Sequence, residues 1–258
     1  RVRDGVEQGA HALRVRSHLL ADEIAARADD GEVVVEVVRD AAGELADDLH
    51  LLRALDDRLQ LNLAAFYSDY TDMQLTSFTG TVSATLNAGK AKIKGIELEA
   101  TARFTDNFSM SGMLGYIDAK YTKFIGAGNI DVSSQRGFQN TPKKTANIRA
   151  TYEWPTALMG RGGKFSLSSD VAYRSDTQQF EFAVPILDQK AFSLWNASLV
   201  WSSADNKLRL GLHGKNLNDK LYKIAGYNFP TLPSVADSSI LAFYGNPRTT
   251  SLTVDYKF

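Results

Sequence analysis

The sequence predicts an all-β protein, an antiparallel transmembrane β-barrel. Three observations predict this fold. Apolar and polar residues alternate with a period of two through most of the chain, aromatic residues close the apolar face near strand ends, and short and long connections alternate. An outer-membrane barrel combines these features, because its strands face lipid on one side and a polar interior on the other.

The alternation defines eight strands. In one of them Ile96, Leu98 and Ala100 alternate with Glu97 and Glu99. The eight alternating segments are 59–68, 96–104, 108–117, 145–154, 165–174, 195–201, 208–215 and 249–258. Each is expected to place its apolar side chains on one face and its polar side chains on the other.

The ends of these strands support a membrane barrel over a soluble β-sandwich or a lipocalin-like binder. Aromatic rings favour the headgroup level of a membrane, where they form two girdles. The connections at 106–107 and 203–206 are tight and the one at 155–163 is moderate. Those at 70–89, 125–142, 176–189 and 224–246 are long. Short turns at one end and long loops at the other are typical of outer-membrane barrels.

Bulk composition excludes several other classes. The formal net charge is -1, which gives no electrostatic attraction to nucleic acid, and no cysteine is present for disulfides or thiolate metal sites. No segment approaches the roughly 20 consecutive apolar residues of a membrane-spanning helix. The N-terminal residues lack the apolar core and small-residue cleavage site of a secretory signal.

Residues 1–57 form an atypical leader. They contain no Phe, Tyr, Trp, Lys, Asn, Thr, Pro or Met, and hold three of the four histidines. Their pattern predicts helices around 10–28 and 41–55 with a strand at 32–38, so the leader is expected to be α-rich or disordered. It could be a small αβα regulatory module. Its Ala/Arg/Asp/Val/Leu runs favour a non-native or misregistered segment, such as a wrong reading frame over GC-rich DNA.

Four motifs resemble the C-terminal part of a TonB-dependent outer-membrane receptor. In chain order they are LNLAAFYSDYTDMQ (Leu61–Gln74), NAGKAKIKGIELEA (Asn87–Ala100), GKNLNDKLY (Gly214–Tyr222) and YGNPRTTSLTVDYKF (Tyr244–Phe258). The resemblance covers about residues 58–258. It implies that these are the C-terminal eight strands of a larger barrel of 22 strands, and that the family's plug domain is not visible here.

The resemblance also implies a function. It is ligand-gated, energy-coupled uptake of a scarce nutrient of the siderophore, haem, cobalamin or oligosaccharide class across the bacterial outer membrane. The implied partners are outer-membrane lipid, a small-molecule ligand, an energy-coupling inner-membrane complex reached through the plug, and the barrel-assembly machinery, which would recognise the strand ending at Phe258.

The long loops supply the candidate ligand contacts. Aromatic residues there can grip flat ligands, but they can equally pack the loops on one another. The candidates are Phe78, Phe138, Phe180, Tyr227, Phe229 and Tyr244.

We predict no catalytic residue, cofactor or metal site. After the leader only His213 is present, and a lone histidine lacks companions at ligand spacing. The alternative to a receptor is a self-standing eight-stranded outer-membrane barrel with a structural or porin-like role, because eight strands can close a small barrel.

Overall fold

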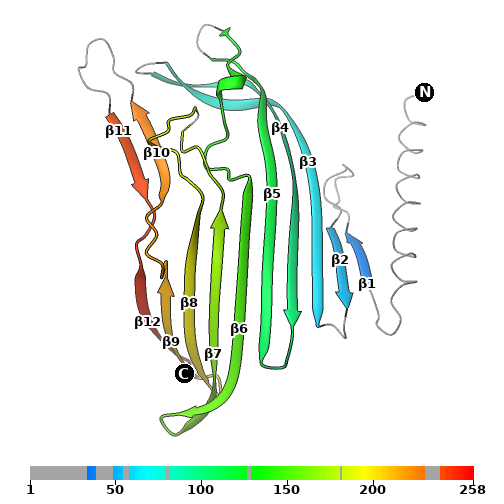
Figure 1. Ribbon diagram of the computed structural model, residues 1–258, viewed down its shortest axis with the longest axis vertical. Coiled ribbons are helices and arrows are strands. Elements are labelled where there is room, and N and C mark those ends of the chain that lie inside the picture. The colour runs from blue at the N-terminus through cyan, green and yellow to red at the C-terminus, as the bar shows by residue number, and fades with distance from the viewer. Residues whose placement is uncertain are drawn as a thin grey trace.

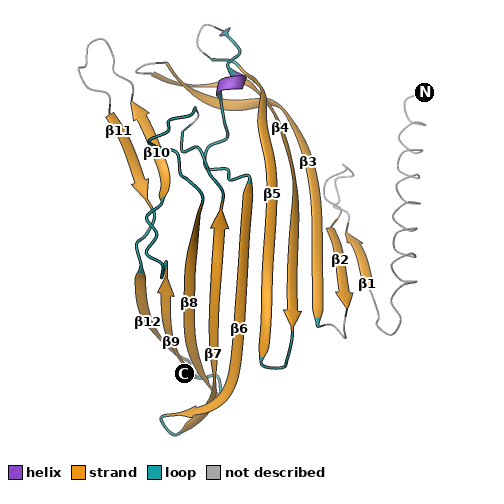
Figure 2. Cartoon of the chain, in the orientation of Figure 1, coloured by secondary structure: helices purple, strands orange, loops and turns teal. Residues whose placement is uncertain are grey.

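The computed structural model describes residues 34–38, 49–54, 58–79, 82–126, 129–180, 182–229 and 239–258. These residues form a tall, curved β-sheet with loops gathered at one end (Figures 1 and 2). A single-turn 3-10 helix, Ser133–Gln135, lies in the loop between β5 (Phe108–Phe124) and β6 (Lys144–Leu158). None of the described ranges contains a helix long and apolar enough to cross a membrane.

The strands follow one another along the chain and pair antiparallel. Their bounds are β1 Val34–Val38, β2 Leu49–Ala54, β3 Leu59–Thr79, β4 Val82–Arg103, β5 Phe108–Phe124, β6 Lys144–Leu158, β7 Arg161–Arg174, β8 Phe192–Ser203, β9 Leu208–Lys215, β10 Lys223–Phe229, β11 Ser239–Tyr244 and β12 Thr249–Tyr256. The main sheet has the order β1-β2-β3-β4-β5-β6-β7-β8-β9-β12, and β10-β11 form a separate hairpin. The predicted all-β antiparallel fold is confirmed, and all eight predicted strands are present.

The sheet is open within the described residues. Strand β12 pairs with β9, whereas β3 is paired on both sides, by β2 and β4. The eight predicted strands therefore do not close on themselves in this structure, as a self-standing eight-stranded barrel would require. An open sheet is consistent with a segment of a larger barrel.

Two strands lie in the segment predicted as the leader. Strand β1, Val34–Val38, confirms the strand expected at 32–38. The helix expected at 41–55 is wrong for Leu49–Ala54, which form β2 and pair with β3 from His50↔Leu63 to Ala54↔Leu59. The physical reason is that an unpaired β3 edge offers a row of backbone donors and acceptors, which outweighs a weak helical pattern. The helix expected at 10–28 lies outside the described residues.

Two of the predicted connections are shorter than expected. Strand β3 continues to Thr79 and β4 already begins at Val82, so most of the connection predicted at 70–89 consists of paired strands of a hairpin. Strands β6 and β7 likewise extend to a two-residue turn at Met159 and Gly160, which have φ angles of 52° and 75°. Positive φ at both central positions fits the right-handed twist of the flanking strands.

The tight turns predicted at 106–107 and 203–206 are confirmed. In the first, the backbone N–H groups of Asn107 and Phe108 donate to Thr105 Oγ1 at 3.2 and 3.0 Å. In the second, the Leu208 N–H donates to Ser203 Oγ at 2.9 Å. Side-chain oxygens thus satisfy backbone donors that the ladder leaves free where the chain reverses.

Apolar side chains lie on one face of the sheet and polar side chains on the other, as the alternation predicts. Residues directly paired in an antiparallel ladder share a face. One row of this kind runs Ala100–Gly112–Ile148–Val171–Trp195 across five strands. Large apolar residues on this face are exposed, including Ile148 at 54% and Leu252 at 74%. Exposure of this extent over a whole face indicates that the face meets lipid.

Aromatic residues border this apolar belt at both ends. At the loop end lie Tyr67, Tyr116 and Tyr173. At the turn end Trp154 stacks on Phe165 with ring centroids 5.4 Å apart, and Phe104 stacks on Phe108 at 5.6 Å. On β6 the two aromatic rows are marked by Lys144, which pairs with Tyr116, and by Tyr152 on the same face. The part of β6 between these two residues has the length of a typical membrane-spanning β-strand.

Candidate ligand-binding surface

A hydrogen-bonded polar network lines the inner face of the sheet. Arg149 on β6 contacts Asp170 on β7, with Nη2 and Oδ1 3.2 Å apart. Asn196 on β8 donates from Nδ2 to the other oxygen of Asp170 at 2.8 Å, and its own Oδ1 accepts from the backbone N–H of Asn216 at 3.0 Å. The network joins three strands and the segment after β9, and it gives the wall charges of both signs.

Further polar pairs continue this wall. Lys164 donates to Glu153 at 2.9 Å, and Asn62 donates to Glu99 at 3.3 Å. His213 Nε2 lies 3.0 Å from Thr253 Oγ1, so this histidine of β9 contacts a hydroxyl on β12. No group of three metal-ligating side chains occurs among the residues that the structure describes. The inner face has the character of a hydrated, charge-balanced lumen.

A small apolar cluster holds the loop between β7 and β8. Phe180, Val184 and Leu187 are buried together, and Ala242 of β11 packs against them. Phe180 also meets Phe182 edge to face, with centroids 4.9 Å apart. Backbone hydrogen bonds of 2.9 Å in both directions between Thr177 and Gln189 close the base of this loop. The predicted ligand candidate Phe180 is therefore a packing residue of the loop in this structure.

The loop between β5 and β6 is braced by aromatic contacts. Phe138, another predicted candidate, stacks on Tyr121 with centroids 4.3 Å apart and ring planes at 8°. The Arg136 guanidinium lies 5.2 Å from the ring centroids of both Phe124 and Phe182, which links this loop to the β7–β8 loop. Phe124 is buried, and cation–π contacts are stronger where the groups are shielded from water.

Hydrogen bonds to Asp131 fix the start of the same loop. Its carboxylate accepts from the backbone N–H groups of Ser133 at 2.9 Å and Phe124 at 3.1 Å. These bonds favour the charged form and hold the pKa of Asp131 below its ordinary value. The loop is thus ordered by a carboxylate that stays ionised at neutral pH.

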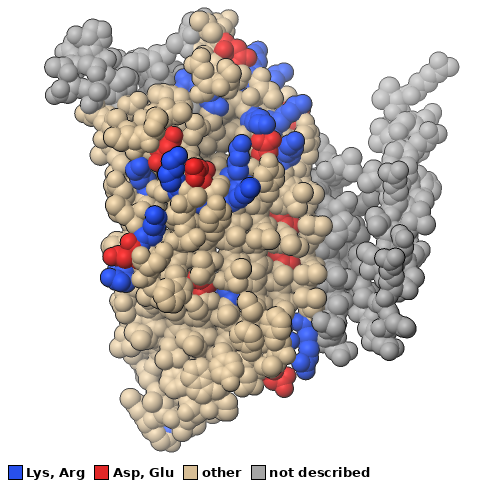
Figure 3. Space-filling model, viewed as in Figure 1, with Lys and Arg blue, Asp and Glu red and all other residues tan. Residues whose placement is uncertain are grey.

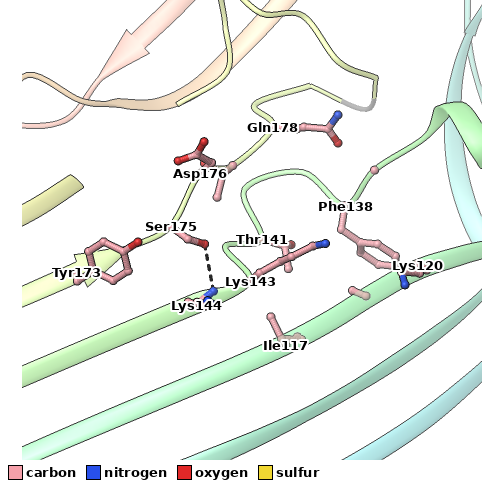
Figure 4. Close-up of a pocket in the computed structure, with 13 residues that line it drawn as sticks. Ile117, Lys120, Phe138, Thr141, Lys143, Lys144, Tyr173, Ser175, Asp176 and Gln178 are labelled. Carbon is pink, nitrogen blue, oxygen red and sulfur yellow. Dashed lines mark hydrogen bonds between the residues drawn. The ribbon is translucent and has the colours of Figure 1, made fainter. Parts of the chain in front are cut away.

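A cavity of about 540 Å³ opens where β6 begins, beneath the two braced loops (Figure 4). It exists because β6 begins at Lys144 whereas its neighbour β5 continues to Phe124. Three lysines border it, Lys120, Lys143 and Lys144, together with Phe138, Tyr173 and Asp176. Among the predicted ligand candidates whose side chains the structure describes, Phe138 alone lines this cavity.

The remaining candidates lie on or near the β10–β11 hairpin and on β3. Tyr227 and Tyr244 are about half exposed, and Tyr227 meets Phe243 edge to face at 6.0 Å. Phe78 and Phe229 belong to β3 and β10 by their backbone pairing, with Ser83 and Ser239 respectively, and their side chains lie outside the described part of the chain. The structure thus distributes the six predicted candidates over several loop segments and does not bring them together in one site.

Sequence reasoning missed the basic lining of the cavity and the Arg136 contacts. A signal for two of these lysines was present, since Lys143 and Lys144 stand together before a predicted strand. The position of Arg136 between two phenylalanines depends on the meeting of two loops distant in sequence, which no local pattern reveals.

The combined features define a class of protein. An antiparallel sheet with a lipid-facing apolar belt, an aromatic row at each border and a polar inner wall is part of an outer-membrane β-barrel. The family model described as TonB dependent receptor-like, beta-barrel matches residues 52–217. The chain belongs to the TonB-dependent receptor family, whose members are bacterial outer-membrane receptors and transporters rather than enzymes. The match begins within β2, before the boundary predicted after residue 57.

Two curated relatives illustrate the likeness in sequence. The chain is 27% identical over 210 residues to the metal-pseudopaline receptor CntO of Pseudomonas aeruginosa, covering 80% of this chain and 26% of that receptor. It is 24% identical over 170 residues to the pesticin receptor of Yersinia enterocolitica, covering 65% and 23%. The chain spans about a quarter of the length of the curated relatives it matches.

Solved structures share the fold. The ferric yersiniabactin uptake receptor FyuA from Yersinia pestis matches with a TM-score of 0.61 at 22% identity, covering 88% of this chain and 33% of that one. The copper transporter OprC matches with a TM-score of 0.55 at 20% identity, covering 81% and 30%. At these identities the likeness establishes the barrel fold.

Proposed function

We propose that the chain serves energy-coupled uptake of a metal chelate across the bacterial outer membrane. The observation that supports this most is the similarity to the metal-pseudopaline receptor over 80% of the chain. The polar inner wall and the aromatic loop end supply what such a passage needs, a hydrated route and a surface that can meet an organic chelator. Energy coupling through a plug domain belongs to the same proposal.

The test is metal uptake by cells that express the gene encoding this chain, in a host that lacks its own chelate receptors. Ferric yersiniabactin labelled with radioactive iron is the first probe, and iron bound to a hydroxamate chelator is the specificity control. Saturable uptake that a protonophore abolishes supports the proposal. Uptake that rises linearly with concentration and persists with the protonophore would overturn it in favour of a porin-like role.

Within this function we propose that the exposed rings of the β10–β11 hairpin contact the ligand. Tyr227 and Tyr244 are about half exposed, and they belong to the hairpin that stands at the loop end of the sheet (Figure 1). Replacing both with alanine is expected to raise the concentration of ferric chelate that half-saturates uptake, by roughly tenfold for the loss of two aromatic contacts. The Tyr227→Phe/Tyr244→Phe protein keeps both rings and is expected to retain most of the affinity.

We also propose that the C-terminal strand presents Phe258 to the barrel-assembly machinery. The side chain of Phe258 is fully exposed and meets Tyr256 edge to face, with centroids 5.1 Å apart. Phe258→Ala is expected to lower the amount of protein in the outer-membrane fraction, while Phe258→Tyr is expected to preserve it. Equal recovery of the alanine variant and the unchanged protein would contradict this assignment.

A further inference from the structure

A band of lysines lies on the lipid-facing side of the sheet, partly level with the aromatic row at the loop end and partly just beyond it. In the ladders, Lys94 pairs with Tyr67 and Lys144 pairs with Tyr116. Lys92 pairs with both Asp69 and Lys120 in the next row. Because paired residues share a face, these lysines point to the same side as the tyrosines. We call Lys90, Lys92, Lys94, Lys120, Lys123 and Lys144 the lysine band.

Burial along β4 agrees with this placement. Gly89, Ala91 and Gly95 are buried, whereas Lys90, Lys92 and Lys94 are exposed. Figure 3 shows charged side chains gathered over the loop-end part of this face, with few charges over most of the remainder. The lysine band therefore borders the apolar belt.

The lysine band contains like charges in direct opposition. Lys90 pairs with Lys123, and Lys92 pairs with Lys120. Like charges directly opposite each other in a ladder destabilise a sheet. Two carboxylates offset part of this repulsion, since Lys92 lies 3.8 Å from Asp69 and Lys120 lies 3.1 Å from Asp118. No salt bridge among the described residues involves Lys90, Lys94, Lys123 or Lys144, so an excess of positive charge remains.

The cavity of about 540 Å³ adjoins the lysine band. Lys120 and Lys144 border both, and Tyr173 of the aromatic row lines the cavity (Figure 4). The backbone N–H of Lys144 is held by Ser175 Oγ at 3.0 Å, which fixes the start of β6 at the cavity edge. An anionic group at the lysine band would thus find a polar recess beside it and the apolar belt below it.

We propose that the lysine band is a docking surface for the phosphate groups of a lipid in the outer leaflet. Aromatic rings mark the headgroup level of a membrane, so lysines that pair with these rings or lie one row beyond them are at the level of headgroup phosphates. Lysine ammonium groups attract such anions, and each adds to the attraction of a charged surface. The apolar belt directly below favours a lipid over a free anion, because it can hold the acyl chains of the same molecule.

The binding test uses the full chain refolded in dodecyl maltoside micelles that contain a small fraction of diphosphorylated lipid A. Bound lipid is measured as phosphorus per protein after size-exclusion chromatography, with phosphatidylcholine as the comparison lipid. The test variant is Lys92→Gln/Lys94→Gln/Lys120→Gln/Lys144→Gln. The matched control is Lys164→Gln/Lys207→Gln/Lys215→Gln/Lys257→Gln, which removes as many charges from positions outside the lysine band.

The test variant is expected to bind roughly tenfold less lipid A than the unchanged chain, because several interfacial charges are lost. The control is expected to bind as the unchanged chain does, and circular dichroism shows whether both variants keep their β-structure. Equal loss in both variants, or equal binding of phosphatidylcholine, overturns the proposal. Complete displacement of lipid A by millimolar inorganic phosphate overturns the commitment to a lipid. Because uptake of a chelate is not measured, this result is independent of the proposed transport function.

Discussion

The two faces of the sheet are built on opposite principles. On the outer face, large apolar side chains such as Ile148 and Leu252 are exposed and make few polar contacts. On the inner face, Arg149, Asp170 and Asn196 are joined by hydrogen bonds across neighbouring strands. The comparison teaches that exposure has a different meaning on each face. Outside it reports contact with lipid, and inside it reports contact with water.

The largest effect is expected from a charge on the outer face. Ile148→Arg places a guanidinium near the middle of the apolar belt, between the two aromatic rows. A charge at that depth costs about 2–4 kcal/mol of folding free energy in a membrane barrel. The measurement is urea unfolding in phosphocholine vesicles, followed by tryptophan fluorescence.

The control for this prediction is the adjacent residue on the inner face. Asn147→Arg adds the same side chain to the polar wall, where Asn147 pairs with Met113 and Ala172. Its effect is expected to stay within about 0.5 kcal/mol, as for most substitutions of hydrated positions. Similar losses for the two variants would show that the two faces do not differ in environment.

The next effect concerns the loop cluster, which is buried in protein rather than in lipid. Leu187 is fully buried between Phe180, Val184 and β11. Leu187→Ala is expected to cost about 2 kcal/mol of local stability, the lower end for buried leucines, because the cluster is small. Hydrogen exchange of the Thr177 and Gln189 amides reports it, since these two residues close the base of the loop. Exchange that quickens equally at amides of β6 would show a global effect instead.

A smaller effect is expected from the inner network. Asp170→Ala removes the acceptor shared by Arg149 and Asn196. The loss is expected to be about 1.5 kcal/mol, typical of hydrogen bonds to a charged group. Urea unfolding in the same vesicles measures it. Glu97→Ala is the matched control, because no hydrogen bond or ion pair of Glu97 is found among the described residues, and an equal loss there would contradict a specific role for the network.

The fold could be predicted from the sequence because its main signal is local. The period of two depends only on neighbours along the chain, and it located eight of the ten strands that the structure describes from Leu59 onward. The two that it missed, β10 and β11, form a separate hairpin within the segment predicted as a long connection at 224–246. The extension of β3 to Thr79 was missed because polar residues at the loop end no longer face lipid, so the alternation fades there while the backbone pairing continues. The strand β2 was missed because its cause, the free edge of β3, lies in a different segment.

The loop end was less predictable for the same physical reason. Phe138 and Phe180 were predicted as ligand contacts from their residue type. In the structure Phe138 stacks on Tyr121 and Phe180 is buried with Leu187, and these contacts depend on which loops meet. The cavity beside Lys144 results from the unequal lengths of β5 and β6, which only the register of the ladder fixes. Contacts between distant segments are invisible to a pattern read along the chain.

The smallest expected effect lies at the turn between β8 and β9, outside both faces. The Asp205 carboxylate accepts from the Ser203 hydroxyl and from the Lys207 backbone N–H, and these bonds hold the pKa of Asp205 below its ordinary value of 3.8. A carboxyl whose pKa is lower in the folded protein than in the unfolded chain stabilises the folded state at every pH above the unfolded pKa. This contribution is lost as the pH falls through the pKa of the folded protein.

Asp205→Asn is therefore expected to lower the urea midpoint slightly at pH 7, and the difference from the unchanged chain should shrink below about pH 4. Unfolding curves of both proteins at the two pH values measure this. A difference that stays constant with pH would show that the turn depends on the shape of the side chain rather than on its charge.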